Sequence, residues 1–314
     1  MNKFFNDVWE GLNATPKRLS SKYFYDEAGD KLFQEIMQTP EYYLTNCELE
    51  IFSEKTDEIS ELMLSHSTSF DLVELGAGDA MKSTFLLKNL QDRKADFVYY
   101  PIDISAHVIE NLSDKLPDEI PGIRINGMNG EYFDMLKQIK KISSRKKVVL
   151  FLGSSIGNIP FEHTGDFLNE LHQQLNPGDL LLTGFDLKKD PRLILAAYND
   201  ASGATKRFNL NLLQRINREL DADFNLAGFE HYPVYDEASG ACKSYLKSLS
   251  KQRVRIGEVG WVHFAKGEMI FMEISQKYSL QQTDELARAN AFKPVKHIFD
   301  NKEWFLDTIW QVVT

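Results

Sequence analysis

Cysteine is scarce in this 314-residue chain, which contains only Cys47 and Cys242. Neither residue belongs to a C-x-x-C pair or has a histidine nearby at ligand spacing. The sequence therefore indicates neither a disulfide framework nor a structural zinc site, and we expect a protein without a metal. Two unpaired thiols are typical of a reducing cytosol, so a cytoplasmic location is expected.

Long apolar runs and an excess of basic residues are also missing. No segment approaches the roughly 20 apolar residues of a membrane span, and charges at Lys3, Asp7 and Glu10 interrupt the N-terminal segment that a signal peptide would need. The net charge is −10, with acidic and basic residues mixed along the chain. Nucleic acid and anionic membranes are therefore not expected as partners. The 43% of hydrophobic residues suffices for a core, and we expect a monomeric globular protein.

The first 60 residues are predicted to be helical, with a tyrosine-rich segment between two helices. Apolar residues recur at helical spacing over Asp26–Met37 and again over Glu48–Met63. Between them lies SKYFYDEAGD…TPEYYLT, which supplies Tyr25 and Tyr42 as candidate functional side chains.

Short apolar runs and amphipathic helices then alternate. The predicted strands are FDLVELGAG, FVYYPID, KKVVLFLGSS and DLLLTGFDL, and the helices between them are Lys82–Leu90, Ala106–Leu116 and Thr164–Leu175. Runs this apolar are typical of strands buried on both faces. The pattern therefore predicts an α/β fold with a parallel sheet covered by helices.

The pattern changes between Asp190 and Tyr278. A helical stretch is predicted over Leu193–Leu220, followed by four strands, HYPVYD, CKSYLKSLS, QRVRIG and EMIFMEISQKYS, that we interpret as an inserted antiparallel sheet. The chain then resumes with a helix over Thr283–Ala291, a strand over Lys293–Ile298 and a last strand in WFLDTIWQVV.

A glycine turn is the first indication of a ligand. The strand in FDLVELGAGD leads into Gly76-Ala77-Gly78, where glycine lets the backbone pass close to a bound molecule. Steric demands of an ordinary strand-to-helix turn would also explain the two glycines. The third glycine of a dinucleotide-binding turn is replaced by Met81, which weighs against an NAD-dependent oxidoreductase.

The next two strands supply acidic and aromatic residues where a nucleoside would need them. Asp103 ends FVYYPID, roughly 25 residues after the glycines, where a carboxylate can bind two ribose hydroxyls. Asp103 can equally be the N-cap of the following helix. Glu131 and Tyr132, in GEYFD, follow a third candidate strand. Glycine turn, acid and aromatic loop in this order resemble a class I methyltransferase that binds S-adenosylmethionine.

Longer blocks carry a more specific resemblance. The blocks are KYFYDEAGDKLFQEIMQTPEYY, LVELGAGDAMKS, VVLFLGSSIGNIP, LLTGFDLKKD, AAYNDASGATKRFNLNLLQRINRELDADFNLAGFEH and MEISQKY. Together they resemble the L-histidine Nα-methyltransferases, which make hercynine for ergothioneine biosynthesis. The resemblance implies a seven-stranded, Rossmann-like methyltransferase domain, residues 51–187 and 278–314. It also implies an α+β substrate-binding domain, residues 1–50 and 188–277.

The resemblance also implies functional residues. Gly76, Lys82, Asp103, Glu131 and Tyr132 would contact S-adenosylmethionine, with Glu131 standing where the family more often has Asp. Tyr25 and Asn158 would orient the substrate amine as the catalytic pair. Tyr198 and Asn158 would bind its carboxylate, and Tyr42, Glu273 and Ser275 would hold the imidazole ring.

Taken without the family, these residues have ordinary interpretations too. Asn158 precedes Pro160 in a turn, a position that favours asparagine. Glu273 and Ser275 share one strand face that solvent alone would explain. Tyr25 and Tyr42 are compatible with core tyrosines whose hydroxyls are hydrogen-bonded.

Two other functions are compatible with the sequence. The α-amine of another amino acid or an indole derivative is one possible substrate, because fungal relatives of this family act on a prenylated tryptophan. Ser244 stands where histidine enzymes commonly carry Met, which bears on the shape of the pocket. A methyltransferase-like module that binds a metabolite without turnover is the other.

Overall fold

The computed structural model describes residues 3–314, which form two compact units. The first unit comprises residues up to Tyr43 together with Lys189–Ser275, and the second comprises Leu44–Lys188 and Gln276–Thr314. The boundaries predicted from the sequence lie at 50/51, 187/188 and 277/278. The division of substrate and cofactor binding between two domains stays a prediction.

A seven-stranded sheet forms the centre of the second unit. Its strands are β2 (Ser69–Leu75), β3 (Asp96–Asp103), β4 (Met128–Asn129), β5 (Lys146–Phe151), β6 (Leu180–Asp186), β12 (Phe292–Phe299) and β13 (Phe305–Val312). They are arranged in the order β12-β13-β6-β5-β2-β3-β4. The strands from β4 to β6 pair in parallel, whereas β13 is antiparallel to both β6 and β12. This is the strand arrangement of the class I, Rossmann-like fold.

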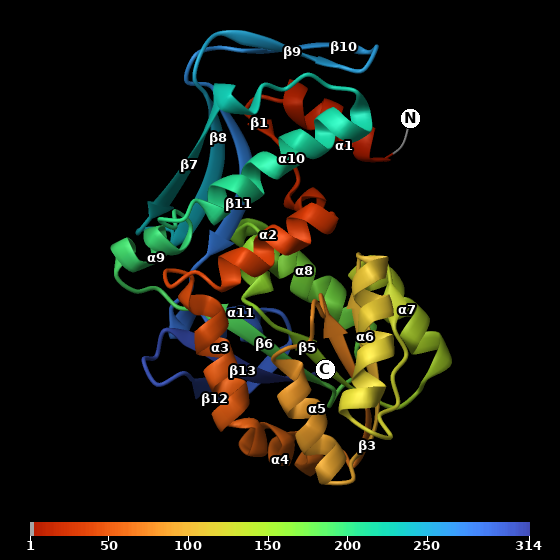
Figure 1. The fold of residues 1–314 in the computed structure, drawn as a ribbon. Helices are drawn as coiled ribbons and strands as arrows, with labels where there is room; N and C mark the ends of the chain where they lie inside the picture. Colours follow the sequence, from red (N-terminus) through yellow and green to blue (C-terminus); the bar gives the residue numbers. More distant parts are fainter. Residues whose placement is uncertain (1–2) are drawn as a thin grey trace. The chain divides into compact units, whose positions relative to one another are not determined.

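Helices cover both faces of this sheet (Figure 1). They are α3 (Tyr43–Glu54), α4 (Thr56–His66), α5 (Ser83–Asp92), α6 (Ala106–Glu119), α7 (Tyr132–Ile142), α8 (Phe161–Gln174) and α11 (Leu280–Ala289). Buried side chains of α7, α8 and α11 pack against one sheet face, in a core that includes Val73, Val149 and Leu181. On helices α4 and α5, which pack against each other, the buried residues include Ile59, Met63 and Leu86. The buried strands thus leave only their ends available for polar chemistry.

The helix predicted over Glu48–Met63 is wrong, because the structure divides it into α3 and α4. Lys55 leaves the helical conformation, with φ −117° and ψ 8°. The hydroxyl of Thr56 donates back to the carbonyl of Phe52, a bond that bends helices. The apolar spacing continues across the break, so periodicity alone predicts one helix.

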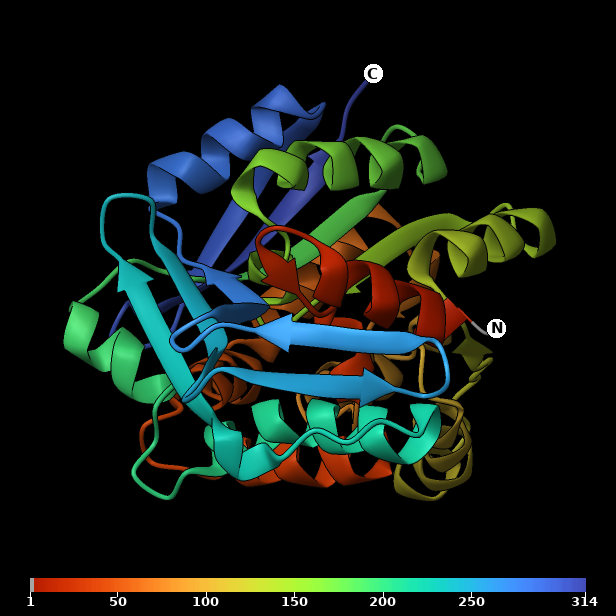
Figure 2. The same cartoon turned by 90° about the horizontal axis from the view of Figure 1, so that it is seen from above.

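The first unit combines two small sheets with helices. Its elements are α1 (Lys3–Asn13), β1 (Lys17–Arg18), η1 (Ser21–Phe24), α2 (Glu27–Met37), α9 (Pro191–Ala197), α10 (Ala204–Leu220), η3 (Leu226–Gly228), β7 (Phe229–Asp236), β8 (Ala241–Ser248), β9 (Gln252–Ile256), β10 (Gly260–Phe264) and β11 (Met269–Gln276). One sheet has the order β1-β11-β8-β7, and β9 and β10 form a separate hairpin (Figure 2). The core of the unit includes Phe24, Phe208, Leu212, Leu246 and Met272.

Two predictions for this unit are wrong. The helical stretch predicted over Leu193–Leu220 is two helices, because the chain leaves α9 at Tyr198 and re-enters a helix only after Gly203, whose φ is +71°. The four inserted strands do not form one antiparallel sheet, because β9 pairs with β10 in the separate hairpin. The larger sheet instead gains β1, which pairs in parallel with β11. No strand was predicted at β10, whose Gly260 approaches the ring of Trp9 on α1.

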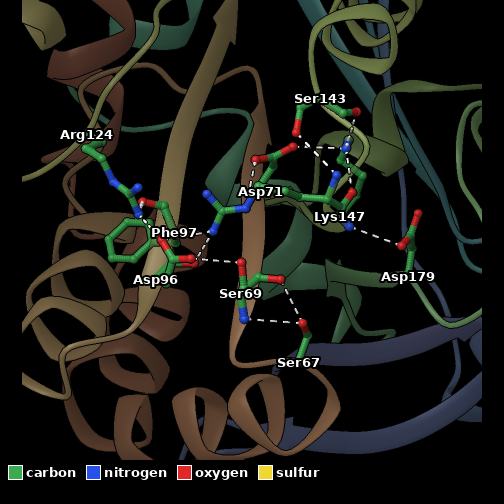
Figure 3. A network of polar contacts seen from close by, with 10 residues as sticks. Ser67, Ser69, Asp71, Asp96, Phe97, Arg124, Ser143, Lys147 and Asp179 are labelled. Atoms are coloured by element: carbon green, nitrogen blue, oxygen red, sulfur yellow. Dashed lines mark hydrogen bonds and ion pairs between the residues drawn. The ribbon is translucent and has the colours of Figure 1, made fainter.

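Ion pairs hold the amino ends of the parallel strands in the second unit (Figure 3). Lys147 and Asp71 lie 2.9 Å apart with side chains 5% and 0% exposed. The ammonium group of Lys147 also donates to the carbonyls of Ser143 and Arg145. Asp179 accepts from the backbone N–H of Lys147 at 3.1 Å. Charged groups at this edge are therefore paired with one another as ions.

No helix within residues 3–314 is long and apolar enough to cross a membrane.

We predict that Lys147→Met lowers the free energy of unfolding by roughly 3 kcal/mol, because it leaves the Asp71 carboxylate buried with a weaker partner, Arg145 at 3.7 Å. Urea unfolding followed by circular dichroism measures the loss. The neighbouring Lys146→Met is the control, since Lys146 is exposed, and it should leave the unfolding midpoint unchanged. A second change, Asp71→Leu, added to Lys147→Met should restore stability. Equal stability of wild type and Lys147→Met would contradict a role for this pair.

Candidate active site

The predicted glycine turn lies directly after β2 in the second unit. Gly76 and Gly78 have φ of +73° and +54°, in the left-handed region where glycine is favoured. A Cβ atom on Gly76 would lie 2.8 Å from the Tyr132 hydroxyl, whereas one on Gly78 would meet nothing within 4 Å. The N–H groups of Gly76 and Ala77 donate to the carbonyl of Ile102 at 2.8 and 3.2 Å. The turn is thus held against β3 and faces open space at Gly78.

Asp103 is the last residue of β3 and faces the glycine turn. Its carboxylate accepts hydrogen bonds from the N–H of Gly78 at 3.2 Å and of Ser105 at 2.9 Å. Burial raises the pKa of Asp103, and these backbone donors partly offset that effect. The N-cap interpretation of Asp103 is wrong, because the helix α6 is capped by Ser105, whose hydroxyl accepts from Val108 N–H. Each carboxylate oxygen keeps capacity for a further donor.

Glu131 and Tyr132 begin α7 beside this turn. Glu131 is the exposed N-cap residue, and Tyr132 packs edge-on against Phe151 with ring centroids 6.0 Å apart. Burial raises the pKa of Tyr132 above its ordinary value. The open cradle at Gly78, the accepting carboxylate of Asp103 and the aromatic ring of Tyr132 together fit the nucleoside portion of S-adenosylmethionine. The individual contacts of these residues with the cofactor stay predictions.

Lys82 lies at the start of α5 in a buried pair that the sequence did not indicate. Its ammonium group contacts the carboxylate of Glu48, which is 1% exposed. Both oxygens of Glu48 also accept from the N–H of Gly153, at 2.8 and 2.9 Å. Burial opposes the charge of Lys82, but the neighbouring Glu48 outweighs it and raises the pKa of Lys82. Glu48 precedes the buried Ile51 and Phe52 by three and four residues, so it lies on the apolar face of its helix. A glutamate on an apolar face is the sequence feature from which a buried carboxylate could have been predicted.

Two further acids lie near this pair. Asp307 on β13 is buried opposite Gly184, and burial together with Glu48 raises its pKa well above the ordinary value. Glu74, near the end of β2, accepts from the Tyr99 hydroxyl, yet burial raises its pKa to about 7.

In the first unit, four of the predicted substrate residues lie in one cluster. The hydroxyl of Tyr198 donates to Ser275 Oγ at 2.7 Å. The rings of Tyr198 and Tyr42 are edge to face with centroids 6.2 Å apart. Phe33 lies between Tyr42 and Tyr25, at 6.3 and 5.8 Å from the two rings. Aromatic faces and two hydroxyl groups thus occur side by side, an arrangement suited to a small polar ring.

The two remaining substrate residues lie on β11 and in a turn. Glu273 is half-buried, two residues before Ser275 on the same face of β11. Asn158 belongs to the second unit, where it ends the short helix η2 (Ser155–Asn158) after β5. Its side chain is exposed and makes no hydrogen bond to another residue in the described part of the chain. The role of Asn158 in substrate binding stays a prediction.

The strand order, the glycine turn and the acid at the end of β3 define a class I S-adenosylmethionine-dependent methyltransferase. The profile of the family described as "Histidine-specific methyltransferase, SAM-dependent" matches residues 4–312, and the chain belongs to this family. S-adenosylmethionine is therefore its cofactor, and an NAD-dependent oxidoreductase is excluded.

Three relatives illustrate the range of the family. The histidine N-alpha-methyltransferase of Mycobacterium tuberculosis is 37% identical over 90% of this chain and 87% of its own length. Ergothioneine biosynthesis protein 1 of Schizosaccharomyces pombe is 29% identical over 91% of this chain and 38% of its own length. An L-tryptophan methyltransferase of Psilocybe serbica is 29% identical over 89% of this chain and 84% of its own length.

We predict that Asp103→Ala weakens binding of S-adenosylmethionine at least tenfold. A hydrogen bond to a charged group contributes about 1.5–3 kcal/mol, and about 1.4 kcal/mol corresponds to tenfold in affinity. Isothermal titration calorimetry measures the dissociation constant. Asp96→Ala, at the exposed amino end of the same strand, is the matched control and should bind normally. Normal cofactor affinity in Asp103→Ala would show that this carboxylate does not bind the ribose.

Proposed function

We propose that this chain transfers methyl groups from S-adenosylmethionine to the α-amino group of L-histidine, up to the trimethylated product hercynine, for ergothioneine biosynthesis. The family description and the names of the mycobacterial and fission-yeast relatives support the proposal. The observation that carries it is the cluster of Tyr42, Tyr198 and Ser275, with Glu273 on the same strand face as Ser275. A monomer acting in the cytoplasm without nucleic acid as a partner belongs to the same proposal.

The residues of this chain then have to present a neutral amine in line with the reactive methyl group. The cofactor supplies that methyl group activated on a sulfonium, so rate depends chiefly on placement of the amine. Tyr25 and Asn158 orient the amine, and Tyr198 and Asn158 bind the carboxylate. A water path removes the proton that the amine must lose, because α-amino groups titrate near pH ~8 or above.

Recognition of the imidazole falls to the polar face of β11. The carboxylate of Glu273 accepts from one ring N–H, which is a charge-assisted bond, and the hydroxyl of Ser275 serves the other side of the ring. Ile270, Met272 and Ile274 are buried on the opposite face of the strand, so the backbone that carries these two groups is fixed by the core. Tyr42 lies beside the ring.

A second acceptor, an aromatic amino acid such as tryptophan, is favoured by one observation. Ser244 on β8 is 2% exposed, and it stands where the resemblance to histidine enzymes implies a larger Met. A smaller side chain here leaves more volume on the face of β8 that Ser244 shares with the core residue Leu246. The tryptophan-methylating relative from Psilocybe serbica shows that the family includes an enzyme named for this acceptor.

An acceptor screen tests the proposal directly. Purified protein is incubated with S-adenosylmethionine and one free amino acid at a time, and mass spectrometry identifies each product and the number of its methyl groups. We expect histidine to give hercynine and tryptophan to give little or no product. Methylation of tryptophan in preference to histidine would replace the proposed substrate, and no turnover on any amine would favour a non-catalytic module.

Specificity for histidine is predicted to depend on Glu273. Removing its carboxylate should weaken histidine binding by about 2–3 kcal/mol, the range for a hydrogen bond to a charged group. A ring without N–H donors should lose nothing comparable, because it makes no such bond to the carboxylate. Glu273→Ala should therefore narrow or invert the preference for histidine over phenylalanine, measured as the ratio of kcat/KM.

The control is Glu258→Ala, in the exposed turn between β9 and β10 of the same unit, which should keep the wild-type ratio. Affinity for S-adenosylmethionine should be unchanged in both variants. Equal losses for all acceptors in Glu273→Ala would place Glu273 in the structural framework.

A further inference from the structure

His231 is a buried residue of the first unit that the function described above does not use. It lies on β7 and is 9% exposed. Its Nε2 is 2.9 Å from the backbone carbonyl oxygen of Tyr198, so this nitrogen carries the proton and donates. Nδ1 is buried and has no hydrogen-bond partner among residues 3–314. The ring therefore makes one directed contact, and that contact ends on a residue of the substrate cluster.

The segment Tyr198–Gly203 that receives this bond is held at several other points. The carboxylate of Asp200 accepts from the N–H groups of Ala204 and Thr205, both at 2.8 Å, which fixes the start of α10. Glu41 accepts from the N–H of Ala201 at 3.1 Å. Asp200 and Glu41 thus fix the middle and end of the segment, whereas His231 holds its first residue through the carbonyl.

Burial favours the neutral form of His231, because it lowers the pKa of the ring. The bond to the Tyr198 carbonyl and the nearby Asp200 oppose this shift, and Lys206 adds to it. The neutral ring with the proton on Nε2 keeps a single donor, directed at Tyr198. A proton on Nδ1 would be buried without an acceptor, which costs free energy.

We infer that His231 is a positioning residue for amino-acid recognition: its bond to the Tyr198 carbonyl sets the end of α9 so that the Tyr198 hydroxyl reaches Ser275. Both bonds are on Tyr198, one at the main chain and one at the side chain, and they anchor it to β7 and to β11. The inference rests on the proposed role of Tyr198 and Ser275 in binding the substrate. It adds a residue that acts through Tyr198.

Two substitutions separate the donor from the packing of the ring. His231→Gln keeps an N–H at about the distance of Nε2 and should bind histidine within about threefold of wild type. His231→Leu fills similar volume without a donor and removes the bond from Nε2 to the Tyr198 carbonyl. We expect His231→Leu to raise the dissociation constant and the KM for histidine about tenfold, a typical effect of a lost buried hydrogen bond. The affinity for S-adenosylmethionine should be unchanged, which also shows that the variant is folded.

A double-mutant cycle tests the route through Tyr198. If His231 acts by placing the Tyr198 hydroxyl, His231→Leu should have less than about a threefold further effect in a Tyr198→Phe background, because coupled residues are not additive. A full tenfold further loss would overturn that route. Equal losses in His231→Leu and His231→Gln would overturn the role of the donor, and unchanged KM in His231→Leu would overturn the inference as a whole.

The acceptor screen on the wild type keeps this inference apart from the proposed function. If the wild type prefers another amino acid, histidine methylation is wrong, and the same variants measured with that amino acid still decide the role of His231. If the wild type binds no amino acid, the role of His231 in recognition is wrong together with the proposed function.

Discussion

The carboxyl edge of the sheet in the second unit depends on the contacts of one buried carboxylate, that of Glu48. A carboxylate without partners at 1% exposure would cost several kcal/mol, and here it is bound by Lys82 and by the N–H of Gly153. These contacts connect α3, the start of α5 and the end of β5. The position of Glu48 also favours glycine at position 184, because a Cβ on Gly184 would lie 2.5 Å from Glu48 Oε1. Burial and the nearby Glu48 carboxylate also raise the pKa of Asp307, which lies opposite Gly184.

The two edges of the sheet in the second unit show how polar groups divide between stability and chemistry. At the amino edge, Lys147 and Asp71 satisfy each other and the nearby backbone (Figure 3). At the carboxyl edge, Asp103 accepts from two backbone N–H groups and keeps acceptor capacity, while Gly78 opens onto space. Parallel strands bind ligands at their carboxyl ends. The capacity that remains at this edge is therefore what a nucleoside cofactor can use.

Much of the fold could be predicted because it is encoded locally. Buried parallel strands appear as short apolar runs, and the glycine turn and Asp103 follow their strands directly in the sequence. The break at Lys55 was missed because the apolar spacing continues through it, and the interruption after Tyr198 because helix-forming residues lie on both sides. The strand β10 was not predicted, although it is as long as β9.

The candidate site was predictable only in part, for a related reason. Residues such as Asp103 are recognised from their position after a strand. Glu48 and Gly153 are 105 residues apart, and Tyr198 and Ser275 are 77 apart, so neither pairing is visible in local sequence. The sequence shows His231 only as one residue of a strand, and its bond to the Tyr198 carbonyl is evident only from the structure. Partners fixed by tertiary contacts have no periodicity to reveal them.

Discrimination between histidine and a larger aromatic acceptor has to come from the polar groups of the first unit. A hydrophobic pocket separates rings of different size only weakly, whereas a site built to hydrogen-bond a ring rejects one that cannot bond, because its own buried polar groups are left unpaired. The proposed recognition of histidine gives this part to Glu273 and Ser275. Such groups discriminate only while they are held in place. Ser275 is held by the Tyr198 hydroxyl, and Tyr198 is in turn held by His231. Selectivity for a polar ring thus depends on the contact residues and also on the buried hydrogen bonds that hold them in place.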